Sequence, residues 1–247
     1  MNQKHSRIKT LSVKAWNPGF MVSSNRRAKV EKIKLILDEA LTQMAKPASR
    51  KRLLDVATGN GEIACNLSEF FDVTSVDVLD QRAYSKGYSF IHVDSEKLPF
   101  PNSSFDLVIS NHVIEHVKNA DMHLSEISRV LKKDGLAYLA TPNRLWPREV
   151  HNKVYFLHYL PPLIFNVILK SMGKHHEDVY LLTWRALRQK ADRFFTISIV
   201  SHKICKWPLK YHMQCSALFI KILSRVPLVF FRMFAFIHPT LVVVLKK

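Results

Sequence analysis

Residues 110–117, SNHVIEHV, combine three side chains that can hold a metal or move a proton: His112, Glu115 and His116. An H-x-x-E-H string on a helix can place two histidines around zinc, if the helix is long and a third ligand lies elsewhere. Here the string directly follows DLVISN, a short apolar run typical of a buried strand. We therefore expect no zinc-peptidase helix at this position.

Acidic residues and glycines at the ends of other apolar runs form a second candidate group. The run LLDV leads into ATGNGEIA, where Gly59 and Gly61 let the backbone turn sharply and approach a ligand closely. Asp55 precedes this turn, Asp77 ends the run VTSVDV, and Asp94 ends FIHVD. Acids at successive strand ends beside a glycine turn indicate a binding site for a nucleotide-containing molecule.

Alternating strands and helices must position these residues. Apolar spacing predicts an amphipathic helix over 30–45, and short apolar runs then alternate with helical ones. Strands are predicted at 52–56, 72–78, 90–94, 106–111, 135–141, 194–200 and 240–245, and helices at 61–71 and 119–135, the second with Gly135 as its stop signal. This alternation predicts a mostly parallel sheet covered by helices on both faces, with ligands at the carboxyl ends of its strands.

Residues 52–141 resemble the class I S-adenosylmethionine-dependent methyltransferases. ATGNGEIA with Asp55 resembles motif I, usually D-x-G-x-G-x-G, Asp77 resembles motif II, and DSEKLPFPNSSFDLV resembles the following segment. The resemblance implies a Rossmann-like seven-stranded sheet, with Asp77 on the ribose hydroxyls and Asp94 on the adenine amino group. The implied cofactor-binding residues are Asp55, Ala57, Gly59, Asn60, Gly61, Asp77, Val78, Asp94, Ser95, Leu98 and Asn111.

The glycine turn departs from the family at one position and permits one alternative. Ala57 stands where the family more often has glycine, and an alanine there predicts a negative φ; A-T-G-x-G variants resemble quinone-pathway methyltransferases. Gly59-x-Gly61-x-x-Ala64 also satisfies the nicotinamide or flavin fingerprint. Asp55 disfavours that alternative, because its charge would repel a pyrophosphate but attract the ammonium and sulfonium of S-adenosylmethionine.

The histidines permit two kinds of chemistry. His112 is the first candidate for a general base and His151 the second, since imidazole titrates near neutrality; a buried or capping histidine is the alternative for each. The stretch also resembles E-x-x-E-H of ubiquinone-pathway and small-RNA 3′-end methyltransferases, which implies a divalent metal on His112, Glu115, His116 and His151. Related EHV sequences need no metal, so the divalent ion stays a secondary expectation.

The rest of the chain suggests where an acceptor binds. We expect a basic arm at 1–27, the core at 28–141, an aromatic-rich helical acceptor lid at 142–192, and closing strands with an apolar-basic helix at 193–247. TPNRLWPREVHNKVYFLHYLPP resembles methyltransferases of bacterial surface-polysaccharide and lipid-linked sugar pathways, in which Arg144 or Arg148 would meet a phosphate. The alternative is that these aromatics simply pack a helical cap.

The charge distribution points to an anionic partner. The formal net charge is +17, and no acidic residue precedes Glu31 or follows Asp192. Basic residues and prolines interrupt the apolar stretch 217–245, which predicts no membrane span and leaves an interfacial helix or a core helix. The first residues lack a secretory signal and weakly resemble a mitochondrial transit peptide. Three unpaired cysteines favour a reducing compartment, so we expect a cytoplasmic protein, peripheral on the cytoplasmic face of the inner membrane.

The sequence thus predicts methyl transfer, on oxygen, to a glycan, lipid-linked sugar or quinone-like acceptor at a membrane surface. An RNA methyltransferase is the alternative that the net charge favours, although nucleic acid is the less expected partner. A noncatalytic membrane-associated protein that retains only the fold is a further alternative. The acceptor, the methylated atom and the oligomeric state stay open.

Overall fold

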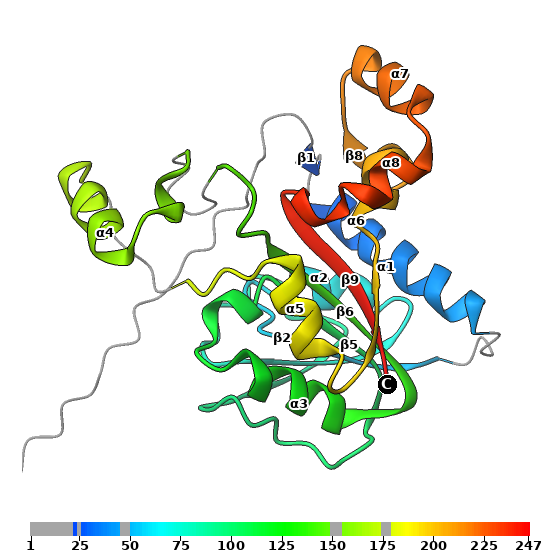
Figure 1. Cartoon of the computed structure of the whole chain (residues 1–247). Helices are drawn as coiled ribbons and strands as arrows, with labels where there is room; N and C mark the ends of the chain where they lie inside the picture. Colours follow the sequence, from blue (N-terminus) through cyan, green and yellow to red (C-terminus); the bar gives the residue numbers. More distant parts are fainter. Residues whose placement is uncertain (1–21, 24–25, 45–49, 149–154, 174–178) are drawn as a thin grey trace, which may run out of the picture.

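Seven strands form a single twisted sheet at the centre of the molecule (Figure 1). The computed structural model describes residues 22–23, 26–44, 50–148, 155–173 and 179–247. The strand order is β4-β3-β2-β5-β6-β9-β7, and β9 runs opposite to the other six strands of this sheet. The strands are β2 (Arg52–Val56), β3 (Asp72–Asp77), β4 (Ser89–His92), β5 (Phe105–Asn111), β6 (Leu131–Pro142), β7 (Thr196–Ile199) and β9 (Thr240–Lys246). The predicted Rossmann-like α/β fold is confirmed.

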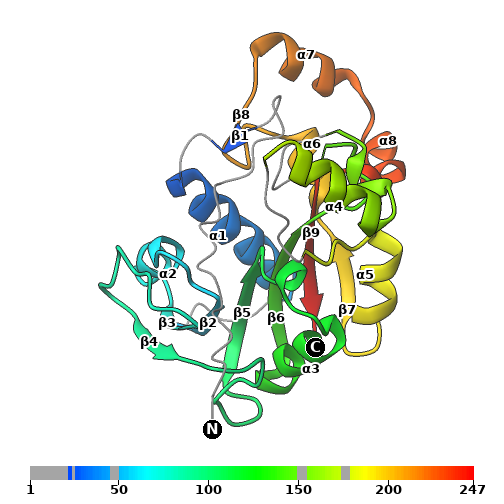
Figure 2. The same ribbon diagram turned by 90° about the vertical axis from the view of Figure 1, so that its left-hand side faces the viewer.

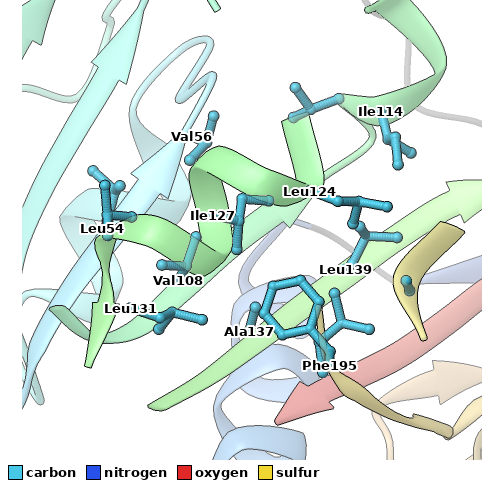
Figure 3. Close-up of a cluster of buried hydrophobic side chains, with 14 of the residues drawn as sticks. Leu54, Val56, Val108, Ile114, Leu124, Ile127, Leu131, Ala137, Leu139 and Phe195 are labelled. Carbon is cyan, nitrogen blue, oxygen red and sulfur yellow. The ribbon is translucent and has the colours of Figure 1, made fainter. Parts of the chain in front are cut away.

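Helices cover both faces of this sheet. One face carries α1 (Arg26–Gln43), α2 (Glu62–Leu67) and α6 (Ser201–Lys206), and the other carries α3 (Ala120–Val130) and α5 (Trp184–Ala191). Successive strand residues point to opposite faces, so Tyr138 of β6 joins the first cluster and Leu139 joins the second. Figure 3 shows the second cluster, in which Leu124 and Ile127 of α3 lie over the strands. The two hydrophobic clusters, one on each face of the sheet, hold the strand ends in fixed positions.

The boundary between α3 and β6 differs from the sequence prediction. Asn119 caps the helix, because its side chain accepts a hydrogen bond from the backbone N–H of Met122 at 3.1 Å. The predicted extension of the helix to Gly135 is wrong, since α3 ends at Val130 and β6 begins at Leu131. Leu131 already pairs with Phe105 of β5, and the register then shifts before the regular ladder. Long-range strand pairing therefore ends this helix earlier than its local pattern indicates.

The C-terminal segment places two short helices beyond the ends of β6 and β9. They are α7 (Ala217–Arg225) and α8 (Leu228–Met233), followed by the turn η3 (Ala235–Ile237). Both views show α7 set well apart from the sheet (Figures 1 and 2), and β8 (Met213–Gln214) before it pairs with β1 (Val22–Ser23). Within the described ranges, every helix is too short or too polar to cross a bilayer.

The predicted lid falls partly within the described residues. Its elements are η2 (Leu157–Tyr159), α4 (Pro162–Ser171) and α5, whereas residues 149–154 and 174–178 lie outside the described part of the chain. Leu187 and Ala191 of α5 are fully buried in the second core cluster, beside α3. By contrast, Ile164 and Val167 of α4 are exposed. The helix α5 is therefore part of the core, and the acceptor lid at 142–192 stays a prediction.

Candidate active site

The predicted acidic residues meet at one edge of the sheet. Asp55 and Asp77 lie near the carboxyl ends of the neighbouring strands β2 and β3. Asp94 follows β4, and the preceding Val93 donates its backbone N–H to the Asp77 carbonyl oxygen at 3.0 Å. Ser95 and the exposed Val78 lie at the same edge, and Asn111 ends β5. The three carboxylates thus come from three adjacent strands.

Asp77 ties the edge of the sheet to the glycine turn. Its Oδ2 accepts a hydrogen bond from the backbone N–H of Gly59 at 2.8 Å, and its Oδ1 accepts one from the N–H of Leu79 at 3.2 Å. A carboxylate offers about four acceptor positions, so two remain for hydroxyl groups of a ligand. Asp77 is half-buried and open enough to use them.

The turn itself needs left-handed backbone at three positions. Ala57, Gly59 and Gly61 adopt φ values of 56°, 57° and 80°. The negative φ expected of Ala57 is wrong: the chain enters the turn in the left-handed region although the Cβ there costs roughly 1–2 kcal/mol. A residue in such strain is typical of a site that the surrounding structure holds in place. This explains why the family favours glycine at that position.

The two glycines serve different purposes. A Cβ at Gly59 would meet nothing within 4 Å, so the backbone here faces open space that a ligand can fill. A Cβ at Gly61 would lie 2.2 Å from the carbonyl oxygen of Tyr84, because the loop after β3 folds against the turn. That loop is held by the carbonyl oxygen of Asn60, which accepts the N–H groups of Ala83 and Tyr84 at 3.0 and 3.1 Å.

Asp55 carries a carboxyl group in an apolar setting. It is 2% exposed, and its Oδ2 accepts a hydrogen bond from the Thr58 hydroxyl at 2.8 Å. Burial raises the pKa of Asp55 to about 7; the Thr58 hydrogen bond opposes this rise and the charge of Asp77 adds to it. In the described part of the chain no basic side chain forms an ion pair with Asp55. A nearby cationic ligand would therefore be favoured by this pair of acids.

Leu98, the predicted apolar wall of the site, is buried in the second core cluster. It is 6% exposed, and its backbone N–H donates to Oε2 of Glu126 at 2.8 Å. Arg129 anchors the same loop by donating to the Leu98 and Phe100 carbonyl oxygens at 2.8 and 2.7 Å. The segment that follows Asp94 is thus fixed to α3, although Asp94 and Ser95 themselves are exposed.

His112 lies immediately after β5, further along the same edge. Its Nδ1 lies 3.1 Å from Oε1 of Glu115, which is 1% exposed, and Oε2 of Glu115 accepts the Thr141 hydroxyl at 2.9 Å. A carboxylate can only accept, so we assign the ring proton to Nδ1, which leaves Nε2 as the basic nitrogen. His112 also holds a left-handed φ of 61°. The arrangement has the form of a histidine base oriented by a buried acid.

Burial and charge keep His112 neutral. Desolvation lowers the pKa of His112 below its ordinary value; Glu115 opposes this shift, and Lys29 and Lys32 of α1 add to it. Burial would raise the pKa of Glu115, but its hydrogen bond and charge interaction with His112 bring it below the ordinary value. Near neutral pH the pair is therefore an uncharged imidazole beside a carboxylate. Lys32, whose own pKa is lowered to about 8 by desolvation and by Lys29, adds positive potential.

The metal and peptidase interpretations depend on the residues of the H-x-x-E-H string that follow His112. Ile114–His116 forms one 3-10 turn, η1, and not the long helix that a zinc peptidase requires. Glu115 is occupied by His112 and Thr141, and among the described residues no three side chains of His, Cys, Asp or Glu converge as a metal site. The fourth predicted ligand and second candidate base, His151, lies outside the described residues.

Three residues of the candidate site were not predicted from the sequence: Thr58, Thr141 and Lys32. Thr58 follows Asp55 by three residues and lies in the turn motif, so its proximity to Asp55 was open to prediction. Thr141 reaches Glu115 only because β6 lies beside β5, and Lys32 reaches the vicinity of His112 only because α1 packs on β6. No local pattern signals either contact.

Comparison with known proteins agrees with this geometry. Residues 54–139 match the family model described as a methyltransferase domain. The ubiquinone biosynthesis O-methyltransferase of Bartonella bacilliformis is 28% identical over 145 residues, which cover 53% of this chain and 58% of that protein. The ubiquinone/menaquinone biosynthesis C-methyltransferase UbiE of Coxiella burnetii is 29% identical over 173 residues, 59% of this chain and 68% of that protein.

A solved structure has the same fold. The S-adenosylmethionine-dependent methyltransferase from Mesorhizobium loti superposes with a TM-score of 0.54 at 16% identity, covering 85% of this chain and 96% of that one. The chain spans about half the length of the first curated relatives that it matches, from 42% to 58%. The residues that match the family model include the glycine turn, the three acids and His112.

Proposed function

Because residues 54–139 match the family model of a methyltransferase domain, we propose that this chain transfers a methyl group from S-adenosylmethionine to a hydroxyl oxygen of an amphipathic acceptor. One observation carries the proposal: Asp55, which is buried and forms no ion pair within the described residues, Asp77 and the carboxylate-oriented His112 follow one another along a single sheet edge. When bound, S-adenosylmethionine supplies a methyl group that its sulfonium has already activated.

The residues of the edge divide the work of binding. Asp77 would accept the ribose hydroxyls with the acceptor positions that Gly59 and Leu79 leave open. Asp94 and Ser95 would bind the adenine, and Leu98, Val78 and Asn111 would lie around its ring. Gly59, Asn60 and Gly61 let the backbone approach the ligand, and Asp55 stabilises its positive charge.

His112 would take the acceptor proton at Nε2. The Nδ1–H of His112 stays hydrogen-bonded to Glu115, which fixes the ring orientation, and the hydroxyl of Thr141 donates to Glu115 and fixes it in turn. The positive potential of Lys29 and Lys32 favours the developing negative charge on the acceptor oxygen. Positioning the acceptor in a site without bulk water accounts for the remaining acceleration. His151 stays a second candidate base.

The acceptor class follows from the relatives and from the surface. Two proteins similar to this chain carry quinone biosynthesis names, which supports a quinone-like acceptor. Exposed aromatics of the predicted lid, Tyr155, Phe156 and Tyr159, suit a sugar ring or an isoprenoid chain equally well. The exposed apolar residues of α7 and α8, next to basic residues, support action at an anionic membrane surface on the cytoplasmic side.

Loss of the gene tests this function directly. Mass spectrometry of lipids and glycans from a deletion strain is expected to reveal a species lighter by one CH₂ group, restored when the wild-type gene is returned. Methyl transfer from labelled S-adenosylmethionine into an extract of that strain should then regenerate the heavier species. Unchanged lipids and glycans, together with no transfer into the extract, would refute the proposal.

The net charge of +17 favours one second candidate, an RNA methyltransferase. Each phosphate contact releases counterions, so RNA affinity that falls steeply as salt rises from 50 to 200 mM would support it. The basic residues of α7 and α8 are interspersed with exposed apolar ones, which suits a lipid surface better than a phosphate backbone.

Replacing Asp77 with alanine is expected to weaken S-adenosylmethionine binding by more than about tenfold. The change removes the acceptors for two ribose hydroxyls and the partner of the Gly59 N–H, and hydrogen bonds to a charged group contribute about 1.5–3 kcal/mol each. Calorimetric titration gives the affinity, and the thermal midpoint shows that the fold persists. Asp80→Ala is the matched control, since Asp80 is exposed and pairs with Arg82; equal affinity losses in both variants would refute the assignment of Asp77.

A further inference from the structure

An apolar cavity lies between the C-terminal helices and the chain that follows β6. Its volume is about 290 Å³, at the small end of the range for ligand pockets. Its lining includes Trp146, Cys205 of α6, Leu223 of α7, Val226, Phe230 of α8 and His238. No residue of α7 or α8 is buried, and Phe230 and Phe234 are about half exposed, so the cavity opens toward the surface.

The lining of the cavity carries no charged side chain near neutral pH. Cys205 and His238 are its two titratable side chains, and the Cys205 sulfur lies 2.8 Å from Nδ1 of His238. Burial raises the pKa of the Cys205 thiol to about 12 and lowers the pKa of His238 to about 4. Both are therefore uncharged near neutral pH and occupied with each other. The space suits hydrocarbon.

The cavity continues the same sheet edge that carries the proposed active site. Asn143, 2% exposed, donates its side-chain amide to the His238 carbonyl oxygen at 2.8 Å, and its N–H donates to the Pro239 carbonyl oxygen at 3.0 Å. Two residues earlier, Thr141 donates to Glu115, the partner of His112. Two residues of strand span roughly 7 Å. Along the edge, the order is the acids of β2 and β3, His112 after β5, then the cavity beyond β6 and β9.

The two helices that line the cavity also carry basic residues, and this part of the sequence has no acidic ones. Lys221 and Arg225 belong to α7 and Arg232 belongs to α8, and no acidic residue follows Asp192. Lys206 holds the helices together by donating to the carbonyl oxygens of Leu223, Ser224 and Val226, at 3.1, 2.9 and 2.6 Å. A molecule with a hydrocarbon chain and an anionic head matches both features.

We propose that this cavity binds the hydrocarbon chain of the acceptor, a lipid with a phosphate-bearing head, and thereby places the head near His112. The identification of this lipid as the acceptor rests on the proposed function. Binding of the hydrocarbon chain in the cavity itself needs no methyl donor. Each methylene that enters the cavity is expected to tighten binding by up to about fourfold, until the cavity is filled.

The test uses a series of alkyl phosphates brominated on the chain, titrated in the absence of S-adenosylmethionine. Bromine close to Trp146 quenches its fluorescence, and Trp146→Phe should remove that part of the signal. We expect affinity to rise with chain length. Affinity that does not change with chain length would overturn the proposal.

Two charge variants on one helix separate the cavity from the surrounding surface. Leu223→Glu puts a charge into the lining and is expected to weaken probe binding at least tenfold, whereas Leu218→Glu adds the same charge to an exposed position of α7 outside the lining and should change it less than twofold. Val226→Phe narrows the cavity without charge and should shorten the longest chain accepted; it replaces Leu223→Glu if that variant unfolds. Equal effects of the two glutamate variants would contradict the proposal.

The test of the cavity proposal can be distinguished from the test of the proposed function. If the probes bind with the expected dependence on chain length but no methyl group is transferred to any lipid, the cavity proposal stands and the proposed function is refuted. If methyl transfer occurs with a KM that does not depend on acceptor chain length and is unchanged in Leu223→Glu, the proposed function stands and the cavity proposal is refuted.

Discussion

His112→Asn is expected to lower kcat by about 10²–10⁴-fold, the range for loss of a general base, while S-adenosylmethionine affinity stays within roughly twofold. Asparagine suits the position because its side-chain amide can still donate to Glu115 in place of Nδ1–H, and because asparagine tolerates the φ of 61° that His112 adopts. What disappears is the basic nitrogen at Nε2. Steady-state kinetics and calorimetry together measure the two quantities.

A positioning variant distinguishes this role from simple packing. Glu115→Gln removes the carboxylate charge that opposes the lowering of the His112 pKa. The acid limb of the rate profile, which in the wild type falls as pH drops through a pKa below 6.5, should therefore shift to still lower pH in this variant. An unshifted profile, or a His112→Asn enzyme with wild-type kcat, would show that His112 is not the base.

Asp55→Asn is expected to stabilise the ligand-free protein at pH 8 by up to about 4 kcal/mol while weakening S-adenosylmethionine binding at least tenfold. The folded-state pKa of Asp55 is raised from 3.8 to about 7, so the folded state holds its proton more tightly than the unfolded chain. Stability therefore declines as pH rises from about 4 to 7, and about three pKa units correspond to about 4 kcal/mol. The amide keeps the shape of the group and removes this cost, but it also removes the charge that attracts the cation.

The pH dependence makes this prediction specific. At pH 5 the carboxyl is protonated in the folded wild type but mostly ionised in the unfolded chain, so the variant should be more stable by only about 1.5 kcal/mol; at pH 8 its advantage should reach about 4 kcal/mol. The affinity of the wild type for S-adenosylmethionine should rise with pH through 7, and that of the variant should not. A variant that is less stable at pH 8, or that binds the ligand normally, would refute the proposed role of Asp55.

The sequence allowed prediction of those parts of the site that follow from strand ends. Because parallel strands share one carboxyl edge, the positions of Asp55, Asp77 and Asp94 after three successive apolar runs were enough to place them side by side. The glycine turn likewise follows from local spacing. The prediction failed at Ala57, where the turn imposes a left-handed backbone against the preference of the residue.

The remaining features depend on contacts between distant segments. The contact of Thr141 with Glu115 arises from the β5 and β6 pairing, and the cavity arises where Asn143 meets the carbonyl oxygens before β9, some 95 residues later in the chain. The early end of α3 has the same cause, since Leu131 pairs with Phe105. Periodicity and composition describe single segments, and these pairings are set by the packing of the whole sheet.

One measurement tests the central claim most directly: calorimetric titration of the wild-type protein with S-adenosylmethionine at pH 8. The acids and the glycine turn at one sheet edge predict saturable binding at a single site per chain, with a Kd between about 1 µM and 1 mM, the usual range for enzyme ligands. Absence of saturable binding over that range, with no rise in the thermal midpoint, would contradict the proposed donor site and every catalytic role assigned to its residues.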